Sequence, residues 1–573
     1  MNAGRLPDPQ PSLNGPIHRW REETILGLLL SLIAYIASMS IVFRDAIVSG
    51  FDLGFGDRAD GLIEISLLEH WRSVFTRAEV WNQPLYFHPY AGTLGYNDGY
   101  FLSGLIYSVW RLAFDPFIAD TLTAFTYKSI GYAATLWLVR GVLRWNWGAA
   151  ILIASLATIS NNMFVQSGHA QVQTLALLPL VASFAILAVR AERDRRRGAL
   201  LWAASAAAVM GAWLLTAFYF AWFAIYFVVV LAGCWLGVAG IWRPAALREL
   251  AETHWRSSAV FAGVFALAAI PFLRVYLPKA RETGGHDFIL LYTVQPIDLL
   301  NVGERNLLWG WLIRGLDRVV QAQALPDGWF DGLAAGGEHI TGFPLLTFVL
   351  LCSAVWRVIR GRDTPRFARI FALAIAIGWA LTLRFGPMSP WALVHDLIPG
   401  ARGLRVVLRY QLFLVLPALL LIGIAFRDDL TRLWRRRPWI AGAVVALLVV
   451  EQLNAAQPTQ LSRAAQLTAF AVVPPPPKDC ASFYVVAARR GELHYGDALH
   501  SGLYPHNVDA MFLAEQWGVP TINGFSTFNP PDWNFATPEA LNYDARVIAY
   551  AQQHGLQHMC RLDMRDPVPW RQL

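Results

Sequence analysis

Residues 51–100 read FDLGFGDRADGLIEISLLEHWRSVFTRAEVWNQPLYFHPYAGTLGYNDGY. They follow an apolar run at 24–43 that is long enough to cross the roughly 30 Å hydrocarbon core of a bilayer. Other polar segments of the chain are short, arginine-dominated or distant in sequence. This stretch is therefore the first place to look for chemistry, because it gathers acids and imidazoles among aromatic residues. These are Asp57, Asp60, Glu64, Glu69, His70, His88 and Asp98.

The composition indicates a polytopic membrane protein. Of the 573 residues, 55% are hydrophobic and 15% charged, with a mean hydropathy of +0.39. The net charge of +7 does not predict nucleic-acid binding, because the basic residues fall in short clusters between apolar runs, where they set membrane topology. The run at 24–43 is too long for a signal-peptide core, so we expect a retained first helix.

Eleven apolar runs are candidate membrane spans. They lie at 24–43, 117–139, 148–164, 174–188, 199–215, 220–240, 259–273, 343–358, 367–383, 412–426 and 440–453.

Arginine placement decides how a further apolar stretch, 101–114, should be read. If that stretch does not cross, the arginine clusters at 140–144, 190–197, 243–256, 357–369 and 427–437 all fall on the side of the N-terminus, as the positive-inside rule requires. We therefore predict that 101–114 is an interfacial helix and that the N-terminus is cytoplasmic.

The remaining polar segments then share the outer side of the membrane. They are a first loop at 44–116, loops at 274–342 and 384–410, and a tail at 454–573 that follows the membrane module 1–453. After the proline run at 474–477, strand-like and helix-like patterns alternate, which predicts a small α/β domain. Cys480 and Cys560 both lie in this tail, and either a disulfide or two unpaired thiols fits the sequence.

Asp57 and Asp60 are the first candidate catalytic residues. If a helix begins near Gly56, their spacing of three places both carboxylates on one face of its first turn. Such a pair can deprotonate a hydroxyl or hold a divalent cation such as Mg²⁺ or Mn²⁺. The alternative is that one or both only cap the helix, since Asp before an apolar run is a favoured N-cap.

Further polar residues are candidates for substrate binding. The loop HPYAGTLGYNDGY offers His88, Asn97 and Asp98 for a carbohydrate or lipid head group, or else wedges the interfacial helix in place. In QSGHAQVQ, His169 lies at the outer end of a span, where a lone histidine is more often satisfied by its neighbours.

Two segments carry cationic candidates. Arg402, Arg405 and Arg409 are outside despite the positive-inside bias, and their spacing predicts one helical face suited to phosphate, or to ion pairs with the first loop. Lys128, deep in a predicted span, could meet a lipid phosphate or pair with Glu451.

The sequence contains no P-loop, dinucleotide GxGxxG, HExxH or paired CxxC pattern. A nucleotide-driven pump and a zinc protease are therefore not predicted.

The motifs GDRAD, LEHW, FHPYAGTLGYNDGY, QSGHAQ and INGFSTFNPPDW, with the topology above, resemble those of the GT-C superfamily of membrane glycosyltransferases. The resemblance extends along most of the chain. It implies an α-helical membrane fold with about eleven spans, a large first outer loop and a C-terminal periplasmic α/β domain. It departs from some GT-C families in lacking a closely spaced DxD or ExD pair.

The resemblance implies an inverting hexosyl- or pentosyltransferase of the cell envelope. Such an enzyme would move a sugar from a polyprenyl-phosphate donor to a glycan, lipid or protein acceptor on the outer face. Asp57 would be the base, with Asp60 as alternate or partner. Arg402, Arg405 and Arg409 would neutralise the departing phosphate, helped by Lys128, Lys279 and Arg281. The alternatives are a transporter or flippase of lipid-linked sugars and a non-enzymatic envelope assembly protein.

Overall fold

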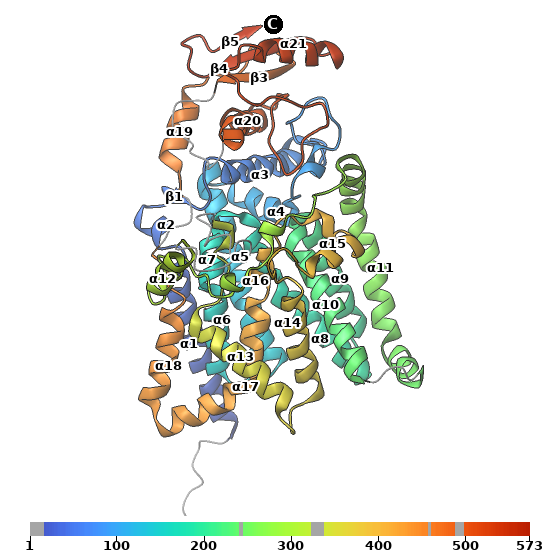
Figure 1. Ribbon diagram of the computed structural model, residues 1–573, viewed down its shortest axis with the longest axis vertical. Coiled ribbons are helices and arrows are strands. Elements are labelled where there is room, and N and C mark those ends of the chain that lie inside the picture. Colours follow the sequence, from blue (N-terminus) through green and yellow to red (C-terminus); the bar gives the residue numbers. More distant parts are fainter. Residues whose placement is uncertain (1–15, 240–243, 322–336, 456–459, 488–497, 573) are drawn as a thin grey trace, which may run out of the picture.

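The structure is a computed structural model that describes residues 16–239, 244–321, 337–455, 460–487 and 498–572. A bundle of helices makes up most of it, with a small sheet stacked over one end (Figure 1). The bundle helices are α1 (Pro16–Val42), α5 (Pro116–Leu136), α6 (Trp147–Thr158), α8 (Leu177–Arg193), α9 (Ala199–Thr216), α10 (Phe218–Ala239), α11 (Pro244–Thr283), α13 (Leu345–Arg360), α14 (Arg366–Ala380), α17 (Val415–Arg436) and α18 (Pro438–Val450).

The eleven predicted runs are mostly helical, but the count of eleven spans is not confirmed. Among the described residues, six helices are long and apolar enough to cross a membrane, or seven if the bent pair Val407–Phe413 and Val415–Arg436 is one span. Helices α13, α14 and α18 have 16, 15 and 13 residues. At 1.5 Å per residue they reach only about 20–24 Å, short of the hydrocarbon thickness. The chain is a multi-pass α-helical membrane protein, as its composition predicts.

The predicted outer segments gather at the end of the bundle that carries the tail (Figure 1). There lie α3 (Asp60–Arg77), α4 (Phe101–Trp110) and α15 (Trp391–Leu397). The turns that join α13 to α14 and α17 to α18, with their arginine clusters, lie at the opposite end. With ten residues, α4 is too short to cross a bilayer, and its interfacial position stays a prediction.

The shorter helices and strands complete the fold. They are α2 (Arg44–Val48), α7 (Asn161–Val165), α12 (Gly310–Gln321), α16 (Tyr410–Phe413), α19 (Arg463–Ala471), α20 (Ala498–Trp517), α21 (Tyr543–Gln553), β1 (Leu53–Gly54), β2 (Leu461–Ser462), β3 (Ser482–Ala487), β4 (Met559–Asp563) and β5 (Trp570–Gln572).

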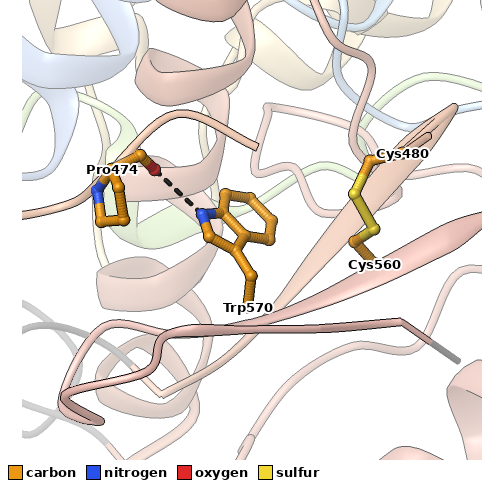
Figure 2. Close-up of a disulfide and its surroundings, with 4 residues drawn as sticks. All are labelled: Pro474, Cys480, Cys560 and Trp570. Atoms are coloured by element: carbon orange, nitrogen blue, oxygen red, sulfur yellow. Dashed lines mark hydrogen bonds between the residues drawn. A yellow bond between two sulfur atoms is a disulfide. The ribbon is translucent and has the colours of Figure 1, made fainter. Parts of the chain in front are cut away.

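The tail is a small α/β unit, as predicted. Its sheet has the order β3-β4-β5, with β3 and β4 parallel and β5 antiparallel to β4. A disulfide joins Cys480, just before β3, to Cys560 on β4, which settles the question that the sequence left open (Figure 2). Beside it, the indole of Trp570 donates a hydrogen bond to the carbonyl of Pro474 at 2.9 Å.

The first outer loop and the tail share a hydrophobic core, so the two are packed together. β1 pairs antiparallel with β2 across more than 400 residues of sequence. The rings of Phe87 and Trp533 meet edge to face with centroids 5.2 Å apart. Arg58 pairs with the fully buried Asp509 at 3.0 Å. Whatever the first loop does, the tail holds it in position.

Candidate active site

The two first-loop aspartates lie at the start of α3, but only one is on it. The helix begins at Asp60, so the expectation that it starts near Gly56 and carries both carboxylates is wrong. Gly56 has φ +81°, and a Cβ on it would lie 2.8 Å from the Cα of Gly61, so only glycine fits this tight turn. The turn places Asp57 beside the helix N-terminus, where its Oδ1 accepts hydrogen bonds from the amides of Ala59 (2.8 Å) and Gly61 (3.5 Å).

Asp57 thus bonds to an amide of the first turn, although the N-cap residue of α3 is Ala59, and the same environment changes its basicity. Burial raises the pKa of Asp57 above its ordinary value of 3.8, and the nearby charge of Asp60 raises it further. The two backbone amides and His169 act in the opposite direction. The net effect is a raised pKa, which makes the ionised carboxylate a better proton acceptor than a surface aspartate.

His169 connects the aspartates to a second carboxylate. It lies between two short 3-10 helices, Gln166–Gly168 and Ala170–Ala176. Its Nδ1 is 3.6 Å from Oδ2 of Asp60, and its Nε2 is 3.7 Å from Oε1 of Glu338. Burial and then the charge of Arg409 lower the pKa of His169 despite the carboxylates around it. The imidazole is thus a neutral bridge between two acids at neutral pH.

Glu338 and Arg409 form the other end of the cluster. Glu338 accepts from Arg409 twice, at 2.8 Å to NH2 and 3.3 Å to Nε. Burial opposes ionisation of Glu338, but Arg409 and His169 lower its pKa to about 2. The guanidinium of Arg409 also lies over the ring of Tyr219, 5.4 Å from its centroid.

The segment that carries the arginines is fixed by the aromatic core beneath it. Directly after Arg409, the buried Tyr410 packs edge to face on Phe223 and Tyr226, each with ring centroids 5.3 Å away. The hydroxyl of Tyr219 accepts a hydrogen bond from the backbone amide of Arg405 at 2.7 Å. These contacts hold the segment against α10.

The single helical face predicted for Arg402, Arg405 and Arg409 is not formed. Two 3-10 helices, Ala401–Gly403 and Val407–Arg409, are separated by a bend at Arg405 between two extended residues, because tertiary contacts decide the local conformation. The side chains therefore have different surroundings. Arg402 is exposed and pairs with Asp396 at 3.4 Å. Arg405 is exposed above the ring of Tyr292, with no carboxylate in salt-bridge contact among the described residues.

The loop residues His88, Asn97 and Asp98 are separated by the fold. The backbone of His88 bonds to the tail, donating to Thr521 at 2.9 Å and accepting from Tyr550 at 3.0 Å. Asn97 Oδ1 accepts from the next amide in the chain.

Asp98 is the member of this loop that approaches the cluster. It accepts from Gln171 at 2.9 Å and from the amide of Phe218 at 3.1 Å. Burial raises its pKa, and the charge of Arg409 is one of the opposing influences.

The lysines lie away from the aspartates. Lys279 donates to Tyr96 at 2.8 Å and to Glu282 at 3.0 Å, so its charge is balanced locally. Arg281 is exposed near the end of α11. Lys128 lines a pocket within the helix bundle, together with Gln173. It does not pair with Glu451, which bonds to Thr347 and Trp309 instead.

The aspartate pair alone does not make a complete cation site. Among the described residues, no third His, Cys, Asp or Glu lies with Asp57 and Asp60 so that all the ligand atoms are within 4.8 Å of one another. Mg²⁺ prefers oxygen ligands and keeps several waters, so two carboxylates could hold it only with help from water or substrate.

Sequence reasoning missed Glu338 and Tyr219. Glu338 lies in GGEH, just ahead of the predicted span at 343–358. An acidic residue directly after two glycines at the end of a span was the feature that could have identified it. Tyr219 directly precedes another predicted span, and nothing in the sequence links it to the arginines.

Comparison with proteins of known structure identifies the fold. No protein-family profile matches the chain, and no curated protein matches its sequence. The oligosaccharyltransferase AglB from Archaeoglobus fulgidus, in complex with an inhibitory peptide and a dolichol-phosphate, superposes with a TM-score of 0.52 and 12% identity. The match covers 94% of this chain and 69% of AglB. The chain has the GT-C fold.

Further solved structures are also similar to this chain. A second AglB structure, in complex with Zn and sulfate, gives a TM-score of 0.52 and 13% identity over 93% of this chain and 67% of AglB. ArnT from Cupriavidus metallidurans in the apo state gives a TM-score of 0.43 and 14% identity, covering 95% of this chain and 93% of ArnT. The two AglB structures, with TM-scores of 0.52, establish the fold, and the roles of individual residues rest on the geometry described above.

Proposed function

We propose that this GT-C chain is a membrane glycosyltransferase that moves a sugar from a polyprenyl-phosphate donor to an acceptor on the outer face of the cytoplasmic membrane. One observation carries the proposal. A row of ionisable side chains runs from Asp57 and Asp60 through the neutral imidazole of His169 to Glu338 and Arg409, on the end of the bundle that carries the tail. A proton acceptor and a guanidinium are thus in one cluster.

In the proposed reaction, Asp57 accepts the proton of an acceptor hydroxyl. The hydroxyl oxygen attacks the anomeric carbon, and the bond from that carbon to the phosphate oxygen breaks with its electron pair leaving on the polyprenyl phosphate. A single displacement of this kind inverts the anomeric centre, whether the sugar is a hexose or a pentose. The amides of Ala59 and Gly61 fix the orientation of the Asp57 carboxylate, which favours this role.

Arg405 is our candidate for meeting the departing phosphate. Its side chain is exposed, and its charge contributes to the field at Glu338 and Tyr219. Arg409, already paired with Glu338, would stabilise the phosphate at longer range and orient Glu338. Because guanidinium can neutralise the leaving phosphate, the transfer needs no cation at Asp57 and Asp60. We give Arg402, Lys128, Lys279 and Arg281 smaller roles than the sequence suggested.

The proposed orientation puts the N-terminus in the cytoplasm and the tail in the periplasm of a bacterial cell. Two observations support it. The arginine clusters at 357–369 and 427–437 lie at the end of the bundle away from the tail (Figure 1). The tail holds the Cys480–Cys560 disulfide, which persists in oxidising compartments (Figure 2).

A transfer assay in detergent micelles separates an enzyme from a transporter or assembly protein. Purified protein would be incubated with radiolabelled polyprenyl-phosphate sugars and a membrane extract as the source of acceptor. We expect labelled sugar to move to acceptor with release of polyprenyl phosphate. A flippase has no two compartments to connect in micelles, so intact donor after incubation with folded protein would contradict the proposal.

A further inference from the structure

A second cluster of ionisable side chains lies where the first outer loop meets the tail. His70 lies on α3, Glu79 lies in the loop that follows it, and Glu515 lies on α20 of the tail. One ligand atom from each residue lies within 4.8 Å of the other two. The cluster is separate from the aspartates at the start of α3 and takes no part in the proposed transfer.

The hydrogen bonding of His70 decides which of its nitrogens faces the cluster. Its Nε2 lies 3.0 Å from the backbone carbonyl of Trp81. A carbonyl oxygen can only accept, so Nε2 carries the proton and, in the neutral ring, Nδ1 carries the lone pair. This arrangement, in which a backbone carbonyl orients an imidazole, is typical of histidines that bind metal.

The cluster holds three buried acceptor atoms without donors, whereas Oε1 of Glu515, the oxygen nearest to Nδ1 of His70, accepts a hydrogen bond from the backbone amide of Leu85 at 2.8 Å. Nδ1 of His70, Oε2 of Glu79 and Oε2 of Glu515 are buried atoms with no hydrogen-bond partner among the described residues. The side chains of His70 and Glu515 are 0% and 2% exposed. Arg77, 3.9 Å from Glu79, is the nearby cation, and its side chain is 43% exposed. Buried acceptors arranged in this way are costly unless a cation lies between them.

We propose that His70, Glu79 and Glu515 bind a zinc ion that fastens the first outer loop to the tail. Ligands at about 2.0–2.1 Å in a tetrahedron stand roughly 3.4 Å apart. Nδ1 of His70 and Oε1 of Glu515 are 3.5 Å apart, which is close to the separation of two ligands in such a tetrahedron.

The chemistry of the three ligands favours zinc. One imidazole with two carboxylates suits zinc better than Mg²⁺ or Ca²⁺, which take oxygen ligands. Glu79 is partly exposed, at 21%, so water can supply the fourth ligand there and the ion can enter from that side.

A proton on Nδ1 of His70 is the alternative to a zinc ion in this cluster. Burial lowers the pKa of His70, but the Glu515 carboxylate and the Trp81 carbonyl raise it by more. A protonated His70 beside Glu515 would also offset the negative charge of the two glutamates. At 3.5 Å from Glu515, however, Nδ1 of His70 has no hydrogen bond.

The test is metal analysis of the full chain in micelles, with any polyhistidine tag removed. Protein is stripped with EDTA, re-equilibrated with zinc and analysed by mass spectrometry for bound metal. We expect one zinc per chain. His70→Gln and Glu515→Gln should lose it, and Glu79→Gln, at the partly exposed ligand, should bind zinc at least roughly tenfold more weakly. Co²⁺ in place of zinc should give the visible absorption of a tetrahedral site.

Matched controls separate this site from others. His554→Gln removes another tail histidine, which pairs with Asp532 at 2.9 Å, and should keep the zinc. Asp57→Asn should also keep it, so zinc binding and sugar transfer can fail independently. A wild-type chain that takes up no zinc, or a zinc content that survives both His70→Gln and Glu79→Gln, would overturn the proposal and leave the proton as occupant.

Discussion

At the scale of single residues, the pH dependence of the transfer rate tests whether Asp57 is the base and Asp60 its neighbour. If Asp57 is the base, activity rises with pH through the pKa of Asp57, which burial and Asp60 hold above 3.8. Replacing Asp60 with Asn removes a negative charge, lowers the pKa of Asp57 and moves the acidic limb to lower pH. We expect Asp60→Asn at pH 5 to retain a larger fraction of its maximal rate than wild type. A pH–rate profile checks this, and an unmoved acidic limb would count against Asp57.

Arg402 and Arg405 also differ in their surroundings, although their spacing in the sequence does not rank them. Arg405 has no described carboxylate partner, whereas Arg402 pairs with Asp396. We predict that Arg405→Ala raises the KM for the lipid donor roughly 10–100-fold, the worth of a hydrogen bond to a charged group. Arg402→Ala should change KM by less than about threefold, because surface ion pairs contribute little. Equal effects of the two substitutions would show that the phosphate lies elsewhere.

The candidate active site was predictable from the sequence only in part, and the position of each residue along the chain explains which part. Asp57, Asp60 and His169 stand next to recognisable span ends, so charge and position alone made them candidates. Glu338 is 71 residues from Arg409, and only the folded outer loops bring them together. Asp57 accepts hydrogen bonds from the amides of Ala59 and Gly61, and these contacts are compatible with a role as base because they occupy only one oxygen of its carboxylate.

At the scale of elements, the turn before α3 is the piece that presents Asp57. Gly56 (φ +81°) and Gly50 (φ +64°) both adopt left-handed backbone, but only Gly56 is crowded by Gly61. Gly50→Ala should cost about 1–2 kcal/mol of backbone strain and leave transfer nearly unchanged. Gly56→Ala carries the same strain and also displaces Asp57, so we expect transfer to fall at least roughly tenfold. Thermal unfolding and the transfer rate, measured together, separate the two effects.

Elements were predicted best where one physical effect dominates. The apolar runs became helices because a bilayer leaves no other way to satisfy the backbone. The segment 402–409 did not become one helix, because contacts with Tyr219 and the aromatic core override its spacing. The count of eleven spans is not confirmed for a related reason: short helices such as α18 look like spans in sequence, yet their helical length is too small.

At the scale of the whole molecule, the positions of the arginine clusters and of the tail predict which side of the membrane each segment faces. In a chain with Cys234 and Cys352 replaced by Ser, one new cysteine is introduced at a time. Leu541→Cys, on the fully exposed surface of the tail, should react with a membrane-impermeant thiol reagent on spheroplasts. Arg362→Cys, between α13 and α14, should react only after the membrane is opened. The reverse pattern would place the proposed site in the cytoplasm.

The central claim is that Asp57 is the base of a sugar transfer, and the rate of polyprenyl phosphate release from a polyprenyl-phosphate sugar tests it most directly. Wild type, Asp57→Asn and the control Asp566→Asn would be compared in micelles at equal thermal stability. Asp566 lies in the tail and pairs with Arg571 at 3.0 Å. We predict that Asp57→Asn slows release about 10²–10⁴-fold, the usual contribution of a general base, and that Asp566→Asn does not. Release by folded Asp57→Asn at the wild-type rate would contradict the account.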